Sequence, residues 1–328
     1  MSVHDSFDLV LPKQVFNMKQ LSFIGFGNQT SAWSQNLRDS QWDITIAVRK
    51  NSPSKAKAEA LNFKTVEMDS QAFLHAENIA LLTPDHTHAE FLNEYAEHLN
   101  PGTRIILAHG YSMVRHDFTK KYPFLNFILF APKAIGSELR AQYIEKGKLG
   151  AVYSLDEIPQ EAKLEHDQWS LMLSYGLGIN LGPFKTSFRH EMEADLLSEQ
   201  GILCSLIPYT AKMMFEMMLK RGIEPELAFF ESWYELKLII NAMVERGPEG
   251  FYDLISPNAL IGSEVGYKLL MNKEFEARLE GLFDDIQSGK FLDYAESVNV
   301  EELRKTIKDR WHGSSLQETQ KRILNGAK

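Results

Sequence analysis

The feature that most constrains the fold is a regular alternation of short apolar runs and longer amphipathic segments between residues 20 and 180. Apolar runs that end in a turn signal are typical of buried strands, and the segments between them have helical periodicity. This order predicts right-handed crossovers and a mostly parallel, doubly wound sheet covered by helices on both faces. The predicted strands are 21–27, 43–49, 78–84, 104–110 and 126–132.

The second half of the chain has a different pattern. Long segments rich in Met and Leu have helical periodicity and little strand character, and the tail after Asn299 is charged, with one short helix expected. A glycine-rich stretch that ends in proline, 176–184, marks the change. We therefore predict an α/β domain over 1–182 and an all-α domain over 183–328. The predicted helical segments are 191–221, 224–246, 260–271 and 272–288.

Composition excludes several classes of protein. With 44 acidic and 35 basic residues the formal net charge is −9, which argues against a nucleic-acid partner. The single cysteine, Cys204, cannot form an internal disulfide. No run approaches 18 apolar residues, and the first residues lack the basic and apolar regions of a secretory signal. The sequence predicts a cytoplasmic protein without a membrane partner.

A glycine turn follows the first predicted strand and opens a helix. Two glycines at this spacing let the backbone turn tightly and approach a pyrophosphate, which then lies at the helix N-terminus. Thr30 stands where a third glycine is usual. The alternative is a glycine turn with no ligand. The candidate dinucleotide-binding residues are Gly25, Phe26, Gly27, Asn28 and Gln29.

The end of the second strand indicates which nicotinamide cofactor binds. An NAD site would place Asp or Glu about 20 residues beyond the glycines, to bind the ribose 2′-hydroxyl. This chain has Arg49, Ser52 and Ser54 there, which can donate to a 2′-phosphate. NADP(H) is therefore favoured over NAD, and the alternative is a solvated basic loop.

Two carboxylate pairs with i,i+4 spacing each occupy one helix face. Asp195 and Glu199 form the first pair, and Glu231 and Glu235 the second, which lies in a helix so apolar that little of it is expected to face solvent. Four carboxylates suit a hard cation such as Mg²⁺, which prefers oxygen ligands. The alternative is ordinary helix surface charge. His86 and His88 share a spacing typical of one loop face but are weak candidates for metal ligands.

The whole chain resembles the ketol-acid reductoisomerase family, also called acetohydroxyacid isomeroreductase, in its short class with one helical C-terminal domain. The spacing between the matching segments holds from end to end. The matching segments are GFGNQ (25–29), VRKNSPSKAKAEALNF (48–63), TPD (83–85), LAHG (107–110), APK (131–133), EADLLSEQGILC (193–204), ELAFFESWYELKLI (226–239) and LISP (254–257).

The resemblance implies a Rossmann-type NADP domain followed by a helical domain that forms a homodimer or a higher homo-oligomer. It also implies two Mg²⁺ ions per site. In this resemblance Asp195 matches the bridging metal ligand and Glu199 its partner on the same helix. Glu231 and Glu235 match the carboxylates that the partner subunit contributes.

The resemblance also implies the remaining site residues and the reaction. His109, Lys133 and Ser256, together with Glu235, match residues of the catalytic site. Pro84 and Asp85 are the matching candidates for cofactor binding. The implied reaction is an alkyl migration in a 2-hydroxy-3-keto acid and a hydride transfer from NADPH, which gives a 2,3-dihydroxy acid in branched-chain amino acid biosynthesis.

The chain departs from the family pattern where the family shapes the substrate pocket. The changes are at Thr30, at Ala134, Ile135 and Ser137, and over 257–263. They leave open a divergent paralogue that acts as an NADPH-dependent reductase on another small keto acid. Two further alternatives are a β-hydroxyacid dehydrogenase, which would not need both acid pairs, and a non-catalytic nucleotide-binding module.

Overall fold

The structure is a computed structural model and describes residues 19–326. The chain divides into two compact units, Met1–Met192 and Glu193–Lys328, which are treated separately below. The ends of the two predicted domains, residues 1–18 and 327–328, lie outside the described residues.

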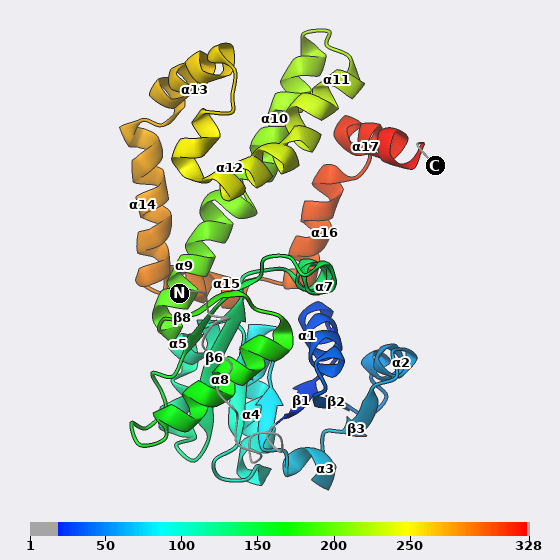
Figure 1. Cartoon of the computed structure of the whole chain (residues 1–328), viewed down its shortest axis with the longest axis vertical. Helices are drawn as coiled ribbons and strands as arrows, with labels where there is room; N and C mark the ends of the chain where they lie inside the picture. Colours follow the sequence, from blue (N-terminus) through cyan, green and yellow to red (C-terminus); the bar gives the residue numbers. More distant parts are fainter. Residues whose placement is uncertain (1–18, 327–328) are drawn as a thin grey trace. The chain divides into compact units, whose positions relative to one another are not determined.

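The first unit is built on one eight-stranded sheet with the order β3-β2-β1-β4-β5-β6-β7-β8 (Figure 1). All neighbouring strands pair in parallel except β6 and β7. The first six follow the order of a dinucleotide-binding Rossmann sheet, which confirms the predicted fold class. The strands are β1 (Gln20–Ile24), β2 (Asp43–Val48), β3 (Lys64–Glu67), β4 (Asn78–Ala80), β5 (Arg104–Leu107), β6 (Asn126–Pro132), β7 (Gly150–Ser154) and β8 (Leu181–Lys185).

Helices cover both faces of this sheet, because alternate residues of its central strands point to two separate cores. In β6, Ile128 and Phe130 belong to one core with Trp33 and Trp169, whereas Phe127 belongs to the other. The helical elements of this unit are α1 (Asn28–Asp39), α2 (Pro53–Ala60), α3 (Gln71–Leu74), η3 (Asp85–Thr87), α4 (His88–Tyr95), η4 (Ala96–His98), α5 (Tyr111–His116), α6 (Phe118–Lys121), α7 (Gly136–Glu145) and α8 (Lys163–Leu177).

The second unit contains only helices among its described residues, as the sequence predicts (Figure 1). Two of them are single π-helical turns. The elements are the end of α9 (Phe188–Ser198), the π-turn η5 (Glu199–Leu203), α10 (Leu206–Lys220), α11 (Pro225–Phe229), the π-turn η6 (Phe230–Tyr234), α12 (Glu235–Tyr252), α13 (Pro257–Leu270), α14 (Lys273–Gln287), α15 (Lys290–Ser297), α16 (Val300–Trp311) and α17 (Ser315–Asn325).

The tail after Asn299 holds two helices, so the expectation of one short helix is wrong. Each begins at a side-chain cap: Asn299 accepts from the first turn of α16, and Ser314 from that of α17. In α17 Leu316 is buried against Phe215 and Phe229, which places this charged segment in the core of the unit. A single buried leucine in a polar helix leaves too weak a periodicity for prediction.

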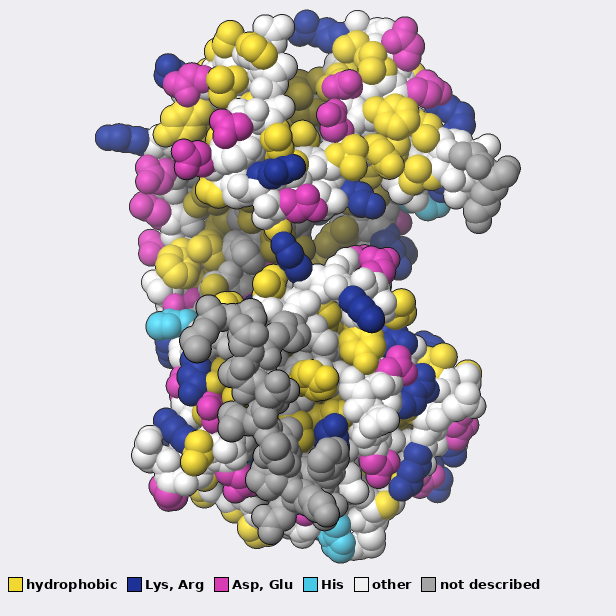
Figure 2. Space-filling view, viewed as in Figure 1, with side chains coloured by type: hydrophobic (Ala, Val, Ile, Leu, Met, Phe, Trp, Pro, Cys, Tyr) yellow, Lys and Arg dark blue, Asp and Glu magenta, His cyan; other side chains and the backbone are white. Residues whose placement is uncertain are grey.

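The helical unit presents many large apolar side chains on its surface (Figure 2). The helical stretch Phe188–Lys220 is long and apolar enough, by length and composition, to cross a membrane. This is weak evidence, because helices of soluble proteins pass the same test. Its apolar section includes the ion pair of Lys212 and Glu216. Exposed apolar residues of α10 to α13 include Met213, Met214, Met217, Leu227, Phe230, Leu238, Met243, Val244, Leu260, Ile261, Val265 and Leu269.

Candidate active site

The glycine turn joins β1 to α1 at the carboxyl edge of the sheet. Gly25 has φ +70°, which favours glycine, and its backbone N–H donates to Ala47 O at 2.8 Å. Gly27 caps α1 without a side-chain hydrogen bond, so the helix begins with backbone N–H groups that can bind an anion. Phe26 between them is buried in the core.

The loop after β6 is held against this turn. Gln29 Nε2 donates to Ala134 O at 3.1 Å. A Cβ atom at Gly136 would lie 2.4 Å from Asn28 O, so only glycine permits this approach of α7 to α1. Thr30, at the usual third glycine position, is buried. The glycine that makes the close contact with α1 is therefore Gly136 of α7.

The basic loop lies beside the glycine turn because β2 pairs with β1, with Ala47 opposite Ile24. Arg49 follows the end of β2 and is exposed. Ser52 is the N-cap of α2, and its Oγ accepts from Ser54 N at 3.3 Å. The loop thus combines a guanidinium with the N-terminus of a short helix at the edge where a dinucleotide would place its adenosine ribose.

A polar network joins the ends of β4, β5 and β6 to the first turn of α9. Glu191 is only 4% exposed, and its two carboxylate oxygens accept from Lys133 Nζ at 2.6 Å and from Gly110 N at 2.7 Å. His109 Nε2 lies 4.0 Å from Glu191 Oε2, and His109 Nδ1 lies 3.4 Å from Asp85 Oδ2. The structure therefore brings three predicted site residues together around a carboxylate that the sequence analysis did not select.

Glu191 did carry a signal in the sequence. It precedes Asp195 by four residues, so it extends the first carboxylate pair by one helical turn. Its position depends on Gly110, where a Cβ atom would lie 1.9 Å from Phe188 O. Only a glycine lets the start of α5 meet the start of α9.

Burial and neighbouring charges shift the pKa values of Asp85 and His88. Burial alone would raise the pKa of Asp85, but the hydrogen bond and charge of His109, together with His88, lower it below its usual range. Burial lowers the pKa of His88 despite the nearby Asp85. His88 is buried while His86 is exposed, so the two histidines do not share one face.

The four predicted metal carboxylates belong to the helical unit. Asp195 is half-buried near the end of α9, whereas Glu199, Glu231 and Glu235 are exposed. Within residues 19–326, no group of three or more His, Cys, Asp or Glu side chains is placed to hold a metal ion. One chain alone therefore does not gather the two carboxylate pairs around one metal ion.

The expectation that the second carboxylate helix has little solvent-facing surface is wrong for a single chain. Leu238 is 54% exposed and Val244 77% exposed, and α12 has no buried residue. Among the described residues, Leu236 and Ile239 are half-buried, whereas Ile240 and Met243 are exposed like Leu238 and Val244. An exposed apolar helix face of this kind is typical of an interaction surface.

Each carboxylate pair lies at a π-helical turn, which the sequence did not predict. Glu199 begins η5, while Glu231 lies within η6 and Glu235 directly follows it. A π-turn adds one residue to the helical repeat and is frequent at functional sites. Ser256, the remaining candidate, is the exposed N-cap of α13, and its Oγ accepts from Ala259 N at 3.2 Å.

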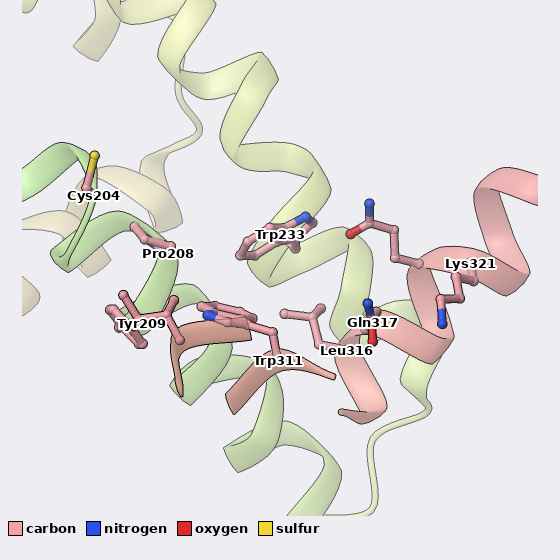
Figure 3. A pocket seen from close by; sticks show the side chains of 10 residues that line it. Cys204, Pro208, Tyr209, Trp233, Trp311, Leu316, Gln317 and Lys321 are labelled. Carbon is pink, nitrogen blue, oxygen red and sulfur yellow. The ribbon is translucent and has the colours of Figure 1, made fainter. Parts of the chain in front are cut away.

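A cavity of about 660 Å³ lies in the helical unit and is lined by residues of α10, η6, α16 and α17 (Figure 3). The Trp311 ring lies 5.9 Å from Trp233 and 5.5 Å from Tyr209, between centroids. None of the predicted site residues lines it. The contacts of Trp311 on α16 with Trp233 on η6 and Tyr209 on α10 hold the π-turn that contains Glu231 against these two helices.

The Rossmann sheet, the polar network at its carboxyl edge and the following helical unit define a two-domain protein of the nicotinamide-dependent oxidoreductase class. A family model described as "Acetohydroxy acid isomeroreductase, NADPH-binding domain" matches residues 15–182. A second, "Ketol-acid reductoisomerase, C-terminal domain", matches 188–324. The chain belongs to the ketol-acid reductoisomerase family.

Relatives with curated names agree with this membership. A ketol-acid reductoisomerase (NADP(+)) of Xanthomonas campestris pv. campestris is 32% identical over 273 residues, which is 83% of this chain and 80% of the relative. One of Beutenbergia cavernae is 31% identical over 281 residues, covering 84% and 80%.

Solved structures agree with the fold. An NADH-preferring ketol-acid reductoisomerase from an uncultured archaean has a TM-score of 0.82 at 22% identity, over 95% of both chains. A pyrroline-5-carboxylate reductase from Coxiella burnetii has a TM-score of 0.60 at 14% identity, over 82% of this chain and 97% of that one. At these identities the likeness shows the fold alone.

Proposed function

We propose that the protein is an NADP(H)-dependent ketol-acid reductoisomerase of branched-chain amino acid biosynthesis. Its substrate would be a 2-hydroxy-3-keto acid, which an alkyl migration and a hydride transfer convert to a 2,3-dihydroxy acid. The network of Lys133, Glu191 and His109 beside the glycine turn, in a chain matched by both family models, carries this proposal.

The nucleotide would lie across the carboxyl edge of the sheet. The glycine turn and the N-terminus of α1 would bind the pyrophosphate, and Arg49 with Ser52 and Ser54 would bind the 2′-phosphate. Pro84 follows β4, the neighbour of β1, at the point where the crossover direction reverses and ligands bind in such sheets.

The polar network would act on the substrate. The Glu191 carboxylate fixes the Lys133 ammonium, which can donate to a substrate oxygen as negative charge develops on it. His109 lies on the other side of Glu191 and can hold or move a proton at Nε2. Ser256 would contact the substrate from the helical domain.

The carboxylate pairs would hold Mg²⁺. The donors of Asp195, Glu199, Glu231 and Glu235 are all oxygens, which fits a hard cation. Two bound Mg²⁺ ions would polarise adjacent substrate oxygens and stabilise the charge of the alkyl migration.

The shared site requires a homodimer. Glu231 and Glu235 would come from the partner subunit, because one chain does not assemble the four carboxylates. The exposed apolar surface of α10 to α13 would be covered by the second copy (Figure 2). A cytoplasmic location, the absence of a membrane or nucleic-acid partner and the domain division at residue 182 are proposed on the sequence arguments above.

The test is conversion of 2-acetolactate by the purified protein with NADPH and Mg²⁺, followed at 340 nm, with the product identified as 2,3-dihydroxy-3-methylbutanoate. We expect turnover that requires the metal. The control omits Mg²⁺ and adds a chelator. If the protein reduces 3-hydroxy-3-methyl-2-oxobutanoate but never converts 2-acetolactate, it is a reductase and not a reductoisomerase.

A further inference from the structure

We infer that Asp85 is a positioning residue, which fixes the tautomer of His109 and directs its Nε2 toward the Lys133–Glu191 pair. The expected effect on kcat rests on the proposed function, whereas the expected tautomer of His109 does not. It differs from the sequence-based assignment of Asp85 to cofactor binding.

Two imidazoles face the Asp85 carboxylate, and only one can donate to it. His88 Nε2 lies 2.8 Å from Thr83 O, a carbonyl that can only accept, so Nε2 carries the proton. His88 Nδ1 then accepts from Ser112 Oγ at 2.8 Å and has no proton for Asp85, 3.9 Å away. Burial, which lowers the pKa of His88, keeps this ring neutral.

His109 is the remaining donor. Its Nδ1 lies 3.4 Å from Asp85 Oδ2, so a proton on Nδ1 satisfies the carboxylate. The other ring nitrogen, Nε2, then lies on the side of Glu191 Oε2, 4.0 Å away, whose second oxygen holds Lys133. A carboxylate that accepts a hydrogen bond from the Nδ1–H of a histidine fixes the tautomer, and so sets which ring nitrogen faces the substrate.

The surroundings hold this geometry in place. The bonds of His88 tie the loop after β4 to Ser112 on α5, the helix that follows His109. Thr87 N donates to Pro84 O at 2.8 Å, and the hydroxyls of Thr83 and Thr87 lie 2.8 Å apart. Asp85 therefore lies on a hydrogen-bonded turn. The bonds of the buried His88 to Thr83 and Ser112 hold this turn at a fixed distance from His109.

The groups near His109 include Asp85, Glu191, His88 and the ring of Tyr111, whose centroid lies 6.1 Å from the imidazole. Lys133 lies beyond Glu191. The Asp85 carboxylate contacts Nδ1, so removing its charge changes the tautomer without removing Lys133 or Glu191.

The first experiment compares Asp85→Asn with the control Glu90→Gln, an exposed carboxylate on α4. We expect kcat to fall about 10- to 100-fold in Asp85→Asn, with the Kd of NADPH within about twofold of wild type. The control should match wild type. In the double variant Asp85→Asn/His109→Gln, turnover should equal that of His109→Gln, because Asp85 acts through His109.

Two kinetic outcomes overturn the inference. One is a loss of NADPH affinity in Asp85→Asn that accounts for the lost activity, which would make Asp85 a cofactor-binding residue. The other is a wild-type kcat in Asp85→Asn.

The second experiment needs no turnover. Histidine-selective ¹⁵N labelling gives the tautomer of His109, whose signals are assigned by their absence in His109→Gln. We expect the Nδ1–H tautomer in the wild-type protein and a shift toward Nε2–H in Asp85→Asn. An unchanged tautomer overturns the inference. A wild-type protein inactive on 2-acetolactate overturns the proposed function instead, and the tautomer still decides the role of Asp85.

Discussion

At the residue scale, the first unit depends on a buried cluster of polar side chains at the amino edge of the sheet. Arg104, at the start of β5, donates to His166 Nδ1 at 2.9 Å and to Asn78 Oδ1 at 3.1 Å, and pairs with Glu165. Burial and the Arg104 charge lower the pKa of His166 to about 4. The folded protein therefore requires this ring to be neutral.

This cluster predicts a loss of stability in acid. The unfolded chain binds a proton at His166 below about pH 6.5, whereas the folded chain does so only below about pH 4. The stabilisation that the neutral His166 ring gives the folded protein is therefore complete above pH 6.5 and is lost as the pH falls toward 4. We expect the free energy of unfolding to fall between pH 7.5 and 5 by about 2 kcal/mol more than in His166→Gln, measured by urea denaturation. An identical pH dependence in both proteins would contradict the prediction.

A second prediction at this scale concerns Arg49. Replacing it with Asp places a carboxylate beside the 2′-phosphate of NADPH and removes charge-assisted hydrogen bonds worth about 1.5–3 kcal/mol. We expect Arg49→Asp to weaken NADPH binding by more than tenfold and to narrow or reverse the preference over NADH. Fluorescence titration with both nucleotides measures this, with Lys50→Asp on the same loop as the matched control. Equal affinities of the wild-type protein for both nucleotides would reject the assignment.

At the element scale, the π-turn η6 sets the direction of Glu231 relative to Glu235. The backbone of this turn carries one residue more than an α-helical turn, and the buried Ser232 donates to Ala228 O, in the preceding α11, at 2.6 Å. Removing one residue would convert the turn to α-helix and rotate the preceding residues by about 100° about the helix axis.

We therefore expect deletion of Ser232 to abolish the response of turnover to Mg²⁺ while the Kd of NADPH, bound in the other unit, stays unchanged. Ser232→Ala is the control, because it keeps the residue count and should retain most of the activity. Near-normal Mg²⁺-dependent activity in the deletion variant would show that the π-turn has no part in the metal site.

At the scale of the whole molecule, the exposed apolar face of the helical unit and the separated carboxylate pairs both predict an obligate homodimer. In such a dimer each site takes Asp195 and Glu199 from one chain and Glu231 and Glu235 from the other. A mixed dimer of Asp195→Asn and Glu231→Gln chains would then have one site with both changes and one with none.

Mixing the two inactive variants under subunit exchange should therefore restore about a quarter of wild-type activity, since half of the dimers are mixed and each has one intact site. Mass spectrometry of a labelled chain verifies the exchange. The control mixes Asp195→Asn with Glu199→Gln chains. Because each site takes both of these residues from one chain, every site of a mixed dimer has one change, and no activity should return. Exchange without recovered activity in the first mixture would reject the shared site.

Much of the first unit follows from local sequence. The apolar runs predict β1, β2, β4, β5 and β6, because strands covered on both faces are nearly continuous in apolar residues. The sequence does not predict the strands β3, β7 and β8: β3 (KTVE) is weakly apolar, and β8 (LGPFK) lies in the glycine-rich stretch that we interpret as the domain boundary. The glycine turn is equally local, since two glycines between a strand and a helix leave few backbone paths.

The sequence by itself therefore determined the fold class, the family and the type of each candidate ligand, because these depend on periodicity and on residue types at fixed spacing. Only the tertiary structure decided that Glu191 links Lys133 to Gly110, since residues 58 and 81 positions apart meet through strand order and not through spacing. It also decided that each carboxylate pair lies at a π-turn and that much of α12 is exposed within one chain, because residue spacing alone sets neither the local helix type nor the burial of a helix.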